Sequence, residues 1–270
     1  MSEPDAQRRE TLERWNHAAA GWGKHAAWLR ETTAPLSLWL VDALQLAPGQ
    51  TVLELAAGPG ETGFIAAQRV GESGKLVSSD NSQAMLEIAQ ARAAELELTN
   101  VEFRLINEES IDLPVASVDA VVCRWGYMLA VDPAAALLET RRVLKPGGRA
   151  ALAVWGSPAQ NAWLSVPSAV LVERGLVPAP EAGPGPFALA DRARLESLLT
   201  GAGFVEVRLD EIQVERGRGS FAEWWERHLD MSSSGPAVRA AAAEVQREIA
   251  AEVQRRLTDF TGHCIVAVAS

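Results

Sequence analysis

The sequence is poor in cysteine and has no cluster of residues spaced to bind a metal. Its 270 residues contain two cysteines, Cys123 and Cys264, which lie far apart and lack metal-ligand spacing. A disulfide framework does not fit this pattern, and no metal site is predicted. Both residues lie in apolar, strand-like runs, so we expect two buried free thiols in a reducing compartment.

Basic residues are also too few and too scattered to form a stripe. The chain has 25 Lys and Arg against 35 Asp and Glu, for a formal net charge of -10. Nucleic-acid binding and anionic-membrane binding both draw most of their affinity from a basic face. We therefore expect neither partner.

No segment has the pattern of a signal peptide or a membrane anchor. Residues 1–13 are rich in charge and lack an apolar signal core. Residues 150–172 carry no charged side chain, but Gly156, Pro158 and Pro167 would interrupt a spanning helix. This stretch is predicted as a strand followed by a loop and a helix, and the protein as soluble and cytoplasmic.

Apolar strands and helices alternate through the middle of the chain, and no internal repeat is present. Residues 11–46 have a helical pattern closed by the turn Pro48-Gly49. After it, we predict strands at 51–56, 75–79, 101–106, 118–123 and 150–155, and helices at 62–70, 82–96 and 133–144. The nearly continuous apolar strands predict a parallel sheet covered on both faces. Ser82 is predicted as an N-cap, and Lys145-Pro146-Gly147-Gly148 as a structural turn before the fifth strand.

The last third of the chain is less regular. We predict helices at 163–174, 192–200, 220–231 and 236–257, a proline-rich covering loop at 176–186, and strands at 204–214 and 262–269. The final strand would then lie antiparallel at an edge. The expected fold is a Rossmann-like, mostly parallel seven-stranded α/β sheet in a single domain. Its parts are a helical cap (1–46), a cofactor-binding core (47–155), and the remaining strands with inserted substrate-covering helices (156–270).

A glycine-rich turn is the main functional motif. The strand at 51–56 leads into Ala57-Gly58-Pro59-Gly60, and a helix follows at once. Glycine lets the backbone bend tightly and lets a ligand approach without a Cβ in the way. Asp80 ends the second strand, 20 residues after Gly60. A carboxylate at that position can accept hydrogen bonds from both ribose hydroxyls of a nucleoside.

The turn alone also satisfies the spacing of a dinucleotide fingerprint. Two carboxylates argue against that reading, because Glu54 precedes the turn and Glu61 follows it. They would repel a pyrophosphate but suit a ligand that carries an ammonium and a sulfonium. A nicotinamide-dependent oxidoreductase is therefore the weaker alternative.

Four motifs in order then resemble one family, the class I S-adenosylmethionine-dependent methyltransferases of the ubiquinone/menaquinone-biosynthesis type. They are the glycine turn, residues 80–86 (DNSQAML), residues 118–124 (VDAVVCR) and residues 141–148 (RRVLKPGG). The resemblance covers roughly residues 15–204. It implies S-adenosylmethionine as the cofactor, and the residues that it assigns to cofactor binding are Trp22, Glu54, Ala56, Gly58, Gly60, Asp80, Asn81, Met85, Asn107, Glu108, Cys123 and Arg124. The pair Asn107-Glu108 stands where the family usually has an aspartate and a small residue beside the adenine.

Tryptophan is abundant, with nine residues, and several lie in segments expected above the carboxyl edge of the sheet. Trp125, Trp155 and one or two tryptophans of the cap are candidates to line a pocket there, although most are expected to serve packing. An apolar or aromatic small-molecule acceptor is therefore expected. His25 and His228 are candidate general bases.

Methyl transfer itself requires mainly alignment and exclusion of water, so the absence of a sharp catalytic motif is compatible with it. The methylated atom (O, C or N) and the oligomeric state stay open. A non-catalytic S-adenosylmethionine-binding regulatory protein remains an alternative.

Overall fold

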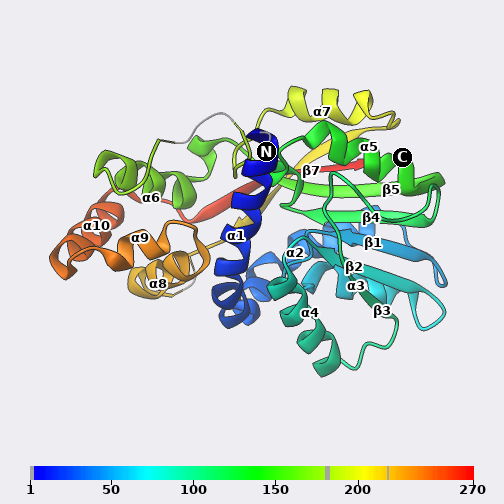
Figure 1. Cartoon of the computed structure of the whole chain (residues 1–270), viewed down its shortest axis with the longest axis horizontal. Coiled ribbons are helices and arrows are strands. Elements are labelled where there is room, and N and C mark those ends of the chain that lie inside the picture. The colour runs from blue at the N-terminus through cyan, green and yellow to red at the C-terminus, as the bar shows by residue number, and fades with distance from the viewer. Residues whose placement is uncertain (1–2, 180–182, 218) are drawn as a thin grey trace.

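A seven-stranded sheet forms the body of the molecule. The computed structural model describes residues 3–179, 183–217 and 219–270. The strands follow the order β3-β2-β1-β4-β5-β7-β6 (Figure 1). Neighbours are parallel except at β7, which is antiparallel to both β5 and β6. The strands are β1 (Thr51–Leu55), β2 (Lys75–Asp80), β3 (Val101–Leu105), β4 (Val118–Arg124), β5 (Leu144–Trp155), β6 (Arg208–Glu215) and β7 (Thr261–Ala269).

Helices connect the strands and extend beyond them. They are α1 (Glu3–Lys24), α2 (Ala26–Ala43), α3 (Glu61–Val70), α4 (Gln83–Glu95), α5 (Pro133–Val143), α6 (Ala162–Glu173), α7 (Arg192–Gly201), α8 (Phe221–Met231), α9 (Gly235–Ala240) and α10 (Ala243–Arg256). Two short 3₁₀ turns occupy Tyr127–Leu129 and Pro158–Gln160. The predicted Rossmann-like α/β class is confirmed.

Local sequence signals account for several helix starts. The Ser82 hydroxyl accepts a hydrogen bond from Met85 N, which confirms it as the N-cap of α4. Asp132 and Asp191 cap α5 and α7 in the same way, and Ser220 begins α8 with a capping box. These side chains accept hydrogen bonds from N–H groups that have no partner within the helix, and each therefore fixes the residue at which its helix begins.

The position predicted for the final strand is wrong. β7 is antiparallel as predicted, but it lies between β5 and β6 rather than at the edge. The side chains explain this placement. Residues 264–267 of β7 (CIVA) are buried, whereas Arg208, Asp210 and Glu211 of β6 are exposed. A charged strand is suited to the edge of a sheet, and an apolar one to a place between two partners.

Two local predictions also need correction. The segment 236–257 is not one helix, because the chain breaks at Ala241 and Ala242 between α9 and α10. The Gln246 side chain donates to Arg239 O and Ala241 O there, and so satisfies carbonyls at the break. Residues 146–148 do not form a turn before β5, since they lie within that strand as an irregularity where its register against β4 shifts.

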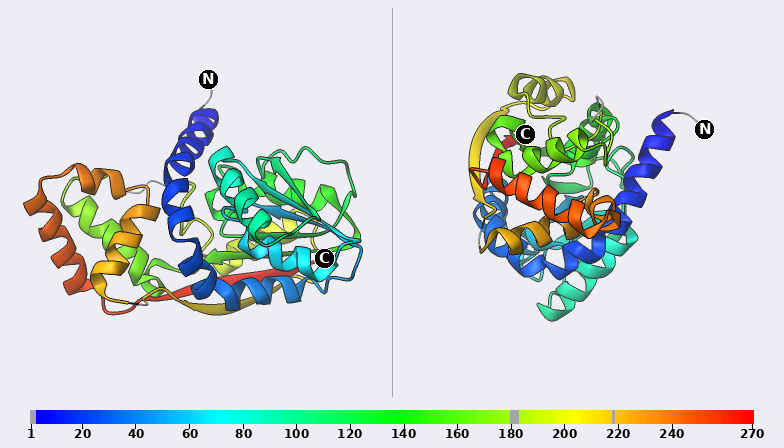
Figure 2. Two further views of the ribbon diagram at one scale, coloured as in Figure 1. Left: turned by 90° about the horizontal axis from the view of Figure 1, so that it is seen from below. Right: turned by 90° about the vertical axis from the view of Figure 1, so that its left-hand side faces the viewer.

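Four helices of the second half of the chain gather at one end of the sheet, whereas α7 packs on α5. Figures 1 and 2 show α6, α8, α9 and α10 together in a helical lobe, with α1 between that lobe and the strands. Helix α1 packs against both α4 and α8. The N-terminal segment thus bridges the sheet side and the lobe. The proline-rich loop predicted at 176–186 falls partly outside the described residues.

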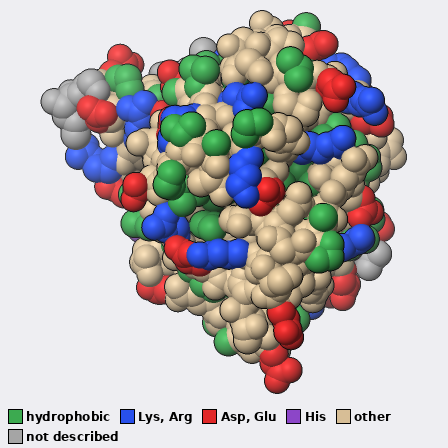
Figure 3. Space-filling view, turned by 90° about the vertical axis from the view of Figure 1, so that its right-hand side faces the viewer, with side chains coloured by type: hydrophobic (Ala, Val, Ile, Leu, Met, Phe, Trp, Pro, Cys, Tyr) green, Lys and Arg blue, Asp and Glu red, His purple; other side chains and the backbone are tan. Residues whose placement is uncertain are grey.

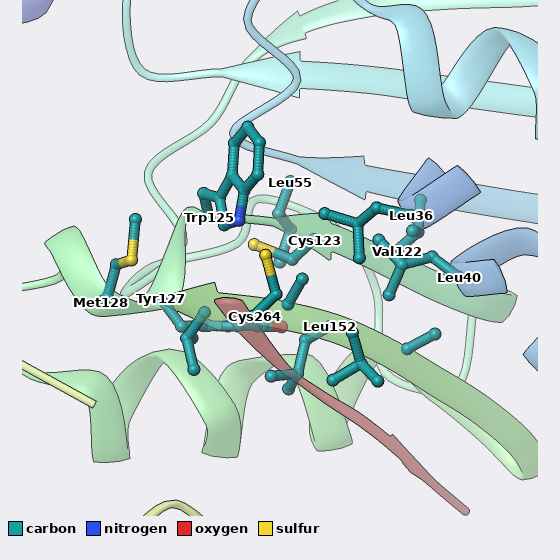
Figure 4. Packing of buried hydrophobic residues seen from close by; sticks show 14 of the residues in the cluster. Leu36, Leu40, Leu55, Val122, Cys123, Trp125, Tyr127, Met128, Leu152 and Cys264 are labelled. Carbon is teal, nitrogen blue, oxygen red and sulfur yellow. The ribbon is translucent and has the colours of Figure 1, made fainter. Parts of the chain in front are cut away.

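The core continues from the sheet into the cap. Figure 4 shows Leu36 and Leu40 of α2 in the same cluster as strand residues, with Trp125 above Cys123. Cys123 and Cys264 are buried free thiols, as predicted. Burial raises the pKa of the Cys264 thiol to about 12. Both sulfurs therefore behave as small apolar groups at neutral pH.

No helix among the described residues has the length and apolar character needed to cross a bilayer. Residues 150–172 form the end of β5, a short turn and most of α6, as predicted. On the face drawn in Figure 3, Lys and Arg alternate with Asp and Glu over the surface.

The contact of α1 with α8 depends on a residue without a side chain. A Cβ at Gly21 would lie 2.0 Å from Asp230 O, whereas one at Gly23 would lie 3.1 Å from the flexible end of Ile88. We expect Gly21→Ala to destabilise the docked α1 by about 2 kcal/mol through overpacking. Hydrogen exchange of residues 11–24 measures this, with Gly23→Ala as the matched control. Equal protection in the two variants would contradict the prediction.

Candidate cofactor and acceptor site

One cavity opens at the carboxyl ends of the strands, and elements from both ends of the chain line it. The loops after β1, β2, β3, β4 and β5 contribute to it, as do α1, α6 and α8. Ligands of open α/β sheets bind at this edge. The residues used below are, on the sheet side, Ala56, Gly58, Asp80, Asn81, Met85, Glu108, Arg124, Trp125 and Trp155, and on the helical side, Trp15, Trp22, Trp28, Trp163, Trp224 and His228, with Arg216 at the end of β6.

The turn after β1 is built from residues with left-handed backbone conformations. Ala56, Gly58 and Gly60 have φ angles of 50°, 53° and 87°. A Cβ added at Gly58 would meet nothing within 4 Å, whereas one at Gly60 would lie 2.4 Å from the ring of Phe64. Gly58 therefore leaves open space on the cavity side, and Gly60 serves the packing of the turn on α3. Gly58 lines the cavity and Gly60 does not.

Glu54 lies beneath this turn, not inside the cavity. Its side chain is buried, and its two carboxyl oxygens accept hydrogen bonds from Gly63 N at 2.7 Å and from Ser78 Oγ at 3.0 Å. Burial raises the pKa of Glu54 to about 8. The predicted direct contact with the cofactor does not match this position. Glu54 instead ties the start of α3 to β1 and β2.

Glu61 is likewise turned away from the cavity. Its carboxylate accepts a hydrogen bond from Arg30 Nη1 at 3.2 Å, and Arg92 Nε lies 3.7 Å from the same oxygen. Two arginines of the protein therefore compensate the negative charge of Glu61. The picture of two acidic groups facing a cationic ligand across the turn is not what the structure shows, because both groups are already bound to α3 or its neighbours.

Asp80 does reach the cavity, at the end of β2. One oxygen accepts from Gly58 N and the other from Ser82 N, both at 2.8 Å. Burial raises the pKa of Asp80, while these backbone N–H groups act in the opposite direction. Each carboxylate oxygen has a second lone pair. Asp80 thus holds the turn to β2 and keeps acceptor capacity toward the cavity.

The loop after β3 divides the predicted adenine pair. The Asn107 side-chain oxygen accepts from Glu109 N at 2.8 Å, so this side chain shapes the loop and does not line the cavity. Glu108 does line it. Burial, with the nearby charges of Asp80 and Glu109, raises the pKa of Glu108 to about 7. Asn81 and Met85 complete this part of the lining.

Helix α1 covers the same region from above. Trp22 lines the cavity, donates through Nε1 to Met231 O at 3.2 Å, and packs edge-to-face on Trp15 with ring centroids 5.7 Å apart. Its predicted place over the cofactor edge is thus compatible with the structure, and its role stays a prediction. The hydrogen bond also ties the cap to the end of α8.

The end of β4 contributes through Arg124 and Trp125. Cys123 is fully buried, and its Cα is paired with Leu55 and Leu152 in the neighbouring strands. It does not line the cavity, because its neighbours in the sheet enclose it. Arg124 lines it, with Cζ 4.6 Å from the Trp125 ring centroid.

The two candidate bases occupy different environments. His25 does not line the cavity, since its Nε2 lies 2.8 Å from Asp230 Oδ2 on α8. His228 lines the cavity and stacks on Trp225 with an interplanar angle of 7°. Burial, followed by the charge of Arg216, lowers the pKa of His228 to about 4. Its ring is therefore neutral at neutral pH, and the structure favours it over His25 as a group that can meet a substrate.

The sequence analysis did not identify Arg216, Trp28 and Trp163 as site residues. Trp28 lies in α2, Trp163 in α6, and Arg216 directly after β6. They are more than 40 residues apart in sequence, and no local motif surrounds any of them. The only signal in the sequence was the abundance of tryptophan, with nine residues, which indicated an aromatic lining of the cavity.

Comparison with known proteins agrees with this geometry. A family model described as a methyltransferase domain matches residues 46–162. Residues 46–162 are therefore similar to known methyltransferase domains. The match includes β1 to β5 and the glycine turn, so it spans the half of the cavity that includes Asp80 and Glu108.

Individual relatives share this part of the chain. The ubiquinone/menaquinone biosynthesis C-methyltransferase of Escherichia coli is 32% identical over 138 residues, covering 51% of this chain and 52% of that protein. An arsenite methyltransferase of Halobacterium salinarum is 41% identical over 109 residues, covering 40% of this chain and 27% of that protein. The chain therefore spans about half or less of the curated relatives that it matches.

Solved structures extend the likeness to most of the chain at the level of fold. YcgJ from Bacillus subtilis superposes with a TM-score of 0.61 at 16% identity, covering 86% of this chain and 96% of that one. The [4+2]-cyclase SpnF gives a TM-score of 0.60 at 21% identity, covering 87% and 80%. The overall fold is thus shared with proteins that include a [4+2]-cyclase.

The domain class uses S-adenosylmethionine, and the residues present fit it. The open space at Gly58 admits a ligand close to the backbone, and Asp80 has acceptor capacity one strand away. Apolar Met85 and Ala57 lie beside them in the lining. The cavity here combines open space at Gly58, the carboxylate of Asp80 and an apolar wall. A nucleoside with a short charged tail fits this combination.

Glu54 makes the stability of the turn depend on pH. Its pKa in the folded protein lies above the value of about 4.3 for an unfolded chain, so the folded state holds this proton more tightly. The resulting stabilisation is complete below the unfolded pKa and is lost as pH rises through the folded value of about 8. Glu54→Gln keeps an acceptor for Gly63 N and offers a donor to Ser78.

We expect the melting temperature of the wild type to fall by about 10 °C more than that of Glu54→Gln between about pH 5 and about pH 9. Differential scanning calorimetry across this range measures the difference. Parallel pH profiles for the two proteins would contradict the assignment of the buried proton to Glu54.

Proposed function

We propose that the protein transfers a methyl group from S-adenosylmethionine to a small acceptor with an apolar or aromatic body. The observation that carries this proposal is the continuity of one cavity. Its β1–β2 end has the bare turn and Asp80, and its far end is walled by Trp28, Trp125 and Trp163. A cofactor and an acceptor bound side by side there would share one enclosed space.

The aromatic wall is closely packed. Trp125 and Trp155 stack with centroids 4.3 Å apart, and Trp155 meets Trp163 edge-on at 5.1 Å. All three side chains are buried. Flat, rigid surfaces of this kind bind planar or apolar ligands at low conformational cost and keep water out.

The reaction places modest demands on the protein. When bound, S-adenosylmethionine supplies a methyl group already activated by a positively charged sulfur, which leaves as a neutral thioether. The protein's part is to align the acceptor and to exclude water. His228 is neutral and lines the cavity, and we propose that it accepts a hydrogen bond from the acceptor, because a pKa lowered to about 4 makes it a weak base at neutral pH.

Binding measurements test the cofactor assignment first. Isothermal titration calorimetry of the purified protein with S-adenosylmethionine, S-adenosylhomocysteine and NAD should show binding of the first two only. Binding of NAD alone would support the nicotinamide-dependent alternative. Turnover is then followed as S-adenosylhomocysteine formation across a panel of small aromatic and apolar acceptors.

The proposal of catalysis fails if the cofactor binds but no acceptor in a broad panel is methylated. That outcome would favour the non-catalytic, regulatory alternative. The likeness to the [4+2]-cyclase SpnF is one reason to measure turnover directly, because this fold alone does not entail methyl transfer.

Asp80 provides a sharper test of the binding geometry. Asp80→Ala removes the acceptor that faces the cavity and should weaken S-adenosylmethionine binding by about 100-fold, the cost of losing charge-assisted hydrogen bonds from two hydroxyls. Asp119→Ala is the matched control, because Asp119 also accepts from a backbone N–H, that of Thr51, but lies at the opposite end of the sheet.

Both variants lose a carboxylate that anchors backbone, so their melting temperatures should fall by similar amounts. Only Asp80→Ala should lose cofactor affinity. Retained affinity in that variant, or an equal loss in Asp119→Ala, would show that Asp80 acts on stability rather than on the ligand.

A further inference from the structure

Arg216 is a buried cation without an ionic partner inside the cavity. Its side chain is 3% exposed, and its Nε and Nη1 atoms are buried without a hydrogen-bond partner. Among the residues that the structure describes, no carboxylate forms a salt bridge with it. An isolated buried charge is costly, and folded proteins seldom keep one without a purpose.

The rings of three tryptophans surround the guanidinium of Arg216. Its Cζ atom lies 4.4 Å from the ring centroid of Trp28, 4.8 Å from that of Trp163 and 5.8 Å from that of Trp125. Burial, followed by the charge of Arg124, lowers the pKa of Arg216 to about 9. The indole faces offer cation–π attraction but accept no hydrogen bonds in the guanidinium plane.

The other unsatisfied groups in this end of the cavity are also donors. Arg124 has buried Nε and Nη1 atoms without a partner, and Trp28 has a buried Nε1 without one. The carboxylates of the lining used above, Asp80 and Glu108, come from β2 and β3 on the other side of β1. Hydrogen-bond donors and positive charge are thus concentrated at the end of the cavity away from Asp80 and Glu108.

The position of Arg216 separates it from the cofactor turn. It follows β6, which lies four strand positions from β1, or about 19 Å across the sheet at the level of the strands. Its stem lies over β7, because a Cβ at Gly262 would come within 3.3 Å of Arg216 Cγ and 2.8 Å of the Trp155 ring. The glycine therefore makes room for the arginine to reach back toward the tryptophans.

We propose that Arg216, assisted by Arg124, binds an anionic group of the acceptor, so that the substrate class is an aromatic or apolar organic anion such as a carboxylate. This inference rests on the proposed function. The guanidinium groups supply the charge-assisted donors, and Trp28, Trp125 and Trp163 hold the apolar body. The rival occupant is the carboxylate of the cofactor's own methionine part, and the test separates the two.

The probe pair is 2-naphthoate and its neutral amide, 2-naphthamide, which share one ring system. Each is titrated by calorimetry into the full chain saturated with S-adenosylhomocysteine. We expect the wild type to bind the carboxylate at least about tenfold more tightly than the amide, as for a desolvated ionic hydrogen bond. Equal affinities in the wild type would overturn the proposal.

Variants then assign the preference to the residue. Arg216→Met keeps the length and apolar burial of the side chain, and should reduce the carboxylate-to-amide ratio to about one. Arg216→Lys should leave an intermediate ratio, since lysine keeps the positive charge but cannot donate the two parallel hydrogen bonds of a guanidinium. Arg208→Met, at the exposed far end of the same strand, is the matched control and should leave the ratio unchanged.

Two further readouts separate the outcomes. Affinity for S-adenosylhomocysteine should be the same in Arg216→Met as in the wild type. A parallel loss of that affinity would assign Arg216 to the cofactor and overturn the proposal. The melting temperature of Arg216→Met should equal or exceed that of the wild type, because an uncompensated buried charge has been removed.

Failure of this inference can be distinguished from failure of the proposed function. A protein that binds no S-adenosylmethionine refutes the proposed function whatever the naphthoate result. A protein that binds the cofactor but shows no preference for the anion, or keeps the preference without Arg216, refutes only the assignment of the acceptor.

Discussion

The backbone N–H groups of the glycine turn and of the first turn of α3 need acceptors, and the acidic side chains of Asp80 and Glu54 supply them. Glu54 accepts from Gly63 at the start of α3, and Asp80 accepts from Gly58 in the turn itself. A buried N–H without a partner costs about 1–3 kcal/mol, so the bend at residues 56–60 depends on these two groups.

Glu54 and Asp80 differ in how deeply they lie below the cavity, and they have different roles. Glu54 is enclosed, and its pKa is raised to about 8, which suits a group that supports the turn from below. Asp80 lies at the cavity surface with lone pairs to spare. This division leaves the end of the cavity beside the glycine turn with one accessible carboxylate on β2 and Glu108 beside it. The tryptophan end, by contrast, contains Arg124 and Arg216. The polarity of the cavity therefore changes from acidic to basic along the sheet edge.

The cap and the lobe close this cavity from two sides. Helix α1 brings Trp15 and Trp22 over it, and α8 brings Trp224 and His228. The hydrogen bond from Trp22 to Met231 O and the close approach at Gly21 join the two covers. Enclosure by helices from opposite ends of the sequence favours exclusion of water during a reaction. It also means that the tryptophan-lined end of the cavity is assembled only in the complete fold.

The sequence alone determined the features that depend on neighbours in the chain. The apolar strands, the caps such as Ser82, the bare turn at Gly58 and the placement of Asp80 at a strand end could all be predicted, because periodicity and backbone chemistry act over a few residues. The fold class and the cofactor followed from the same motifs.

Tertiary structure decided what depends on distant partners. It inserted β7 between β5 and β6, turned Glu54 beneath the sheet edge and His25 toward Asp230, and brought Arg216 among tryptophans from α2, β4 and α6. Burial, pairing and charge balance at these positions are properties of neighbours in space. A buried arginine that forms no salt bridge with the described residues carries no mark in the sequence, since only the packed structure shows which groups surround it.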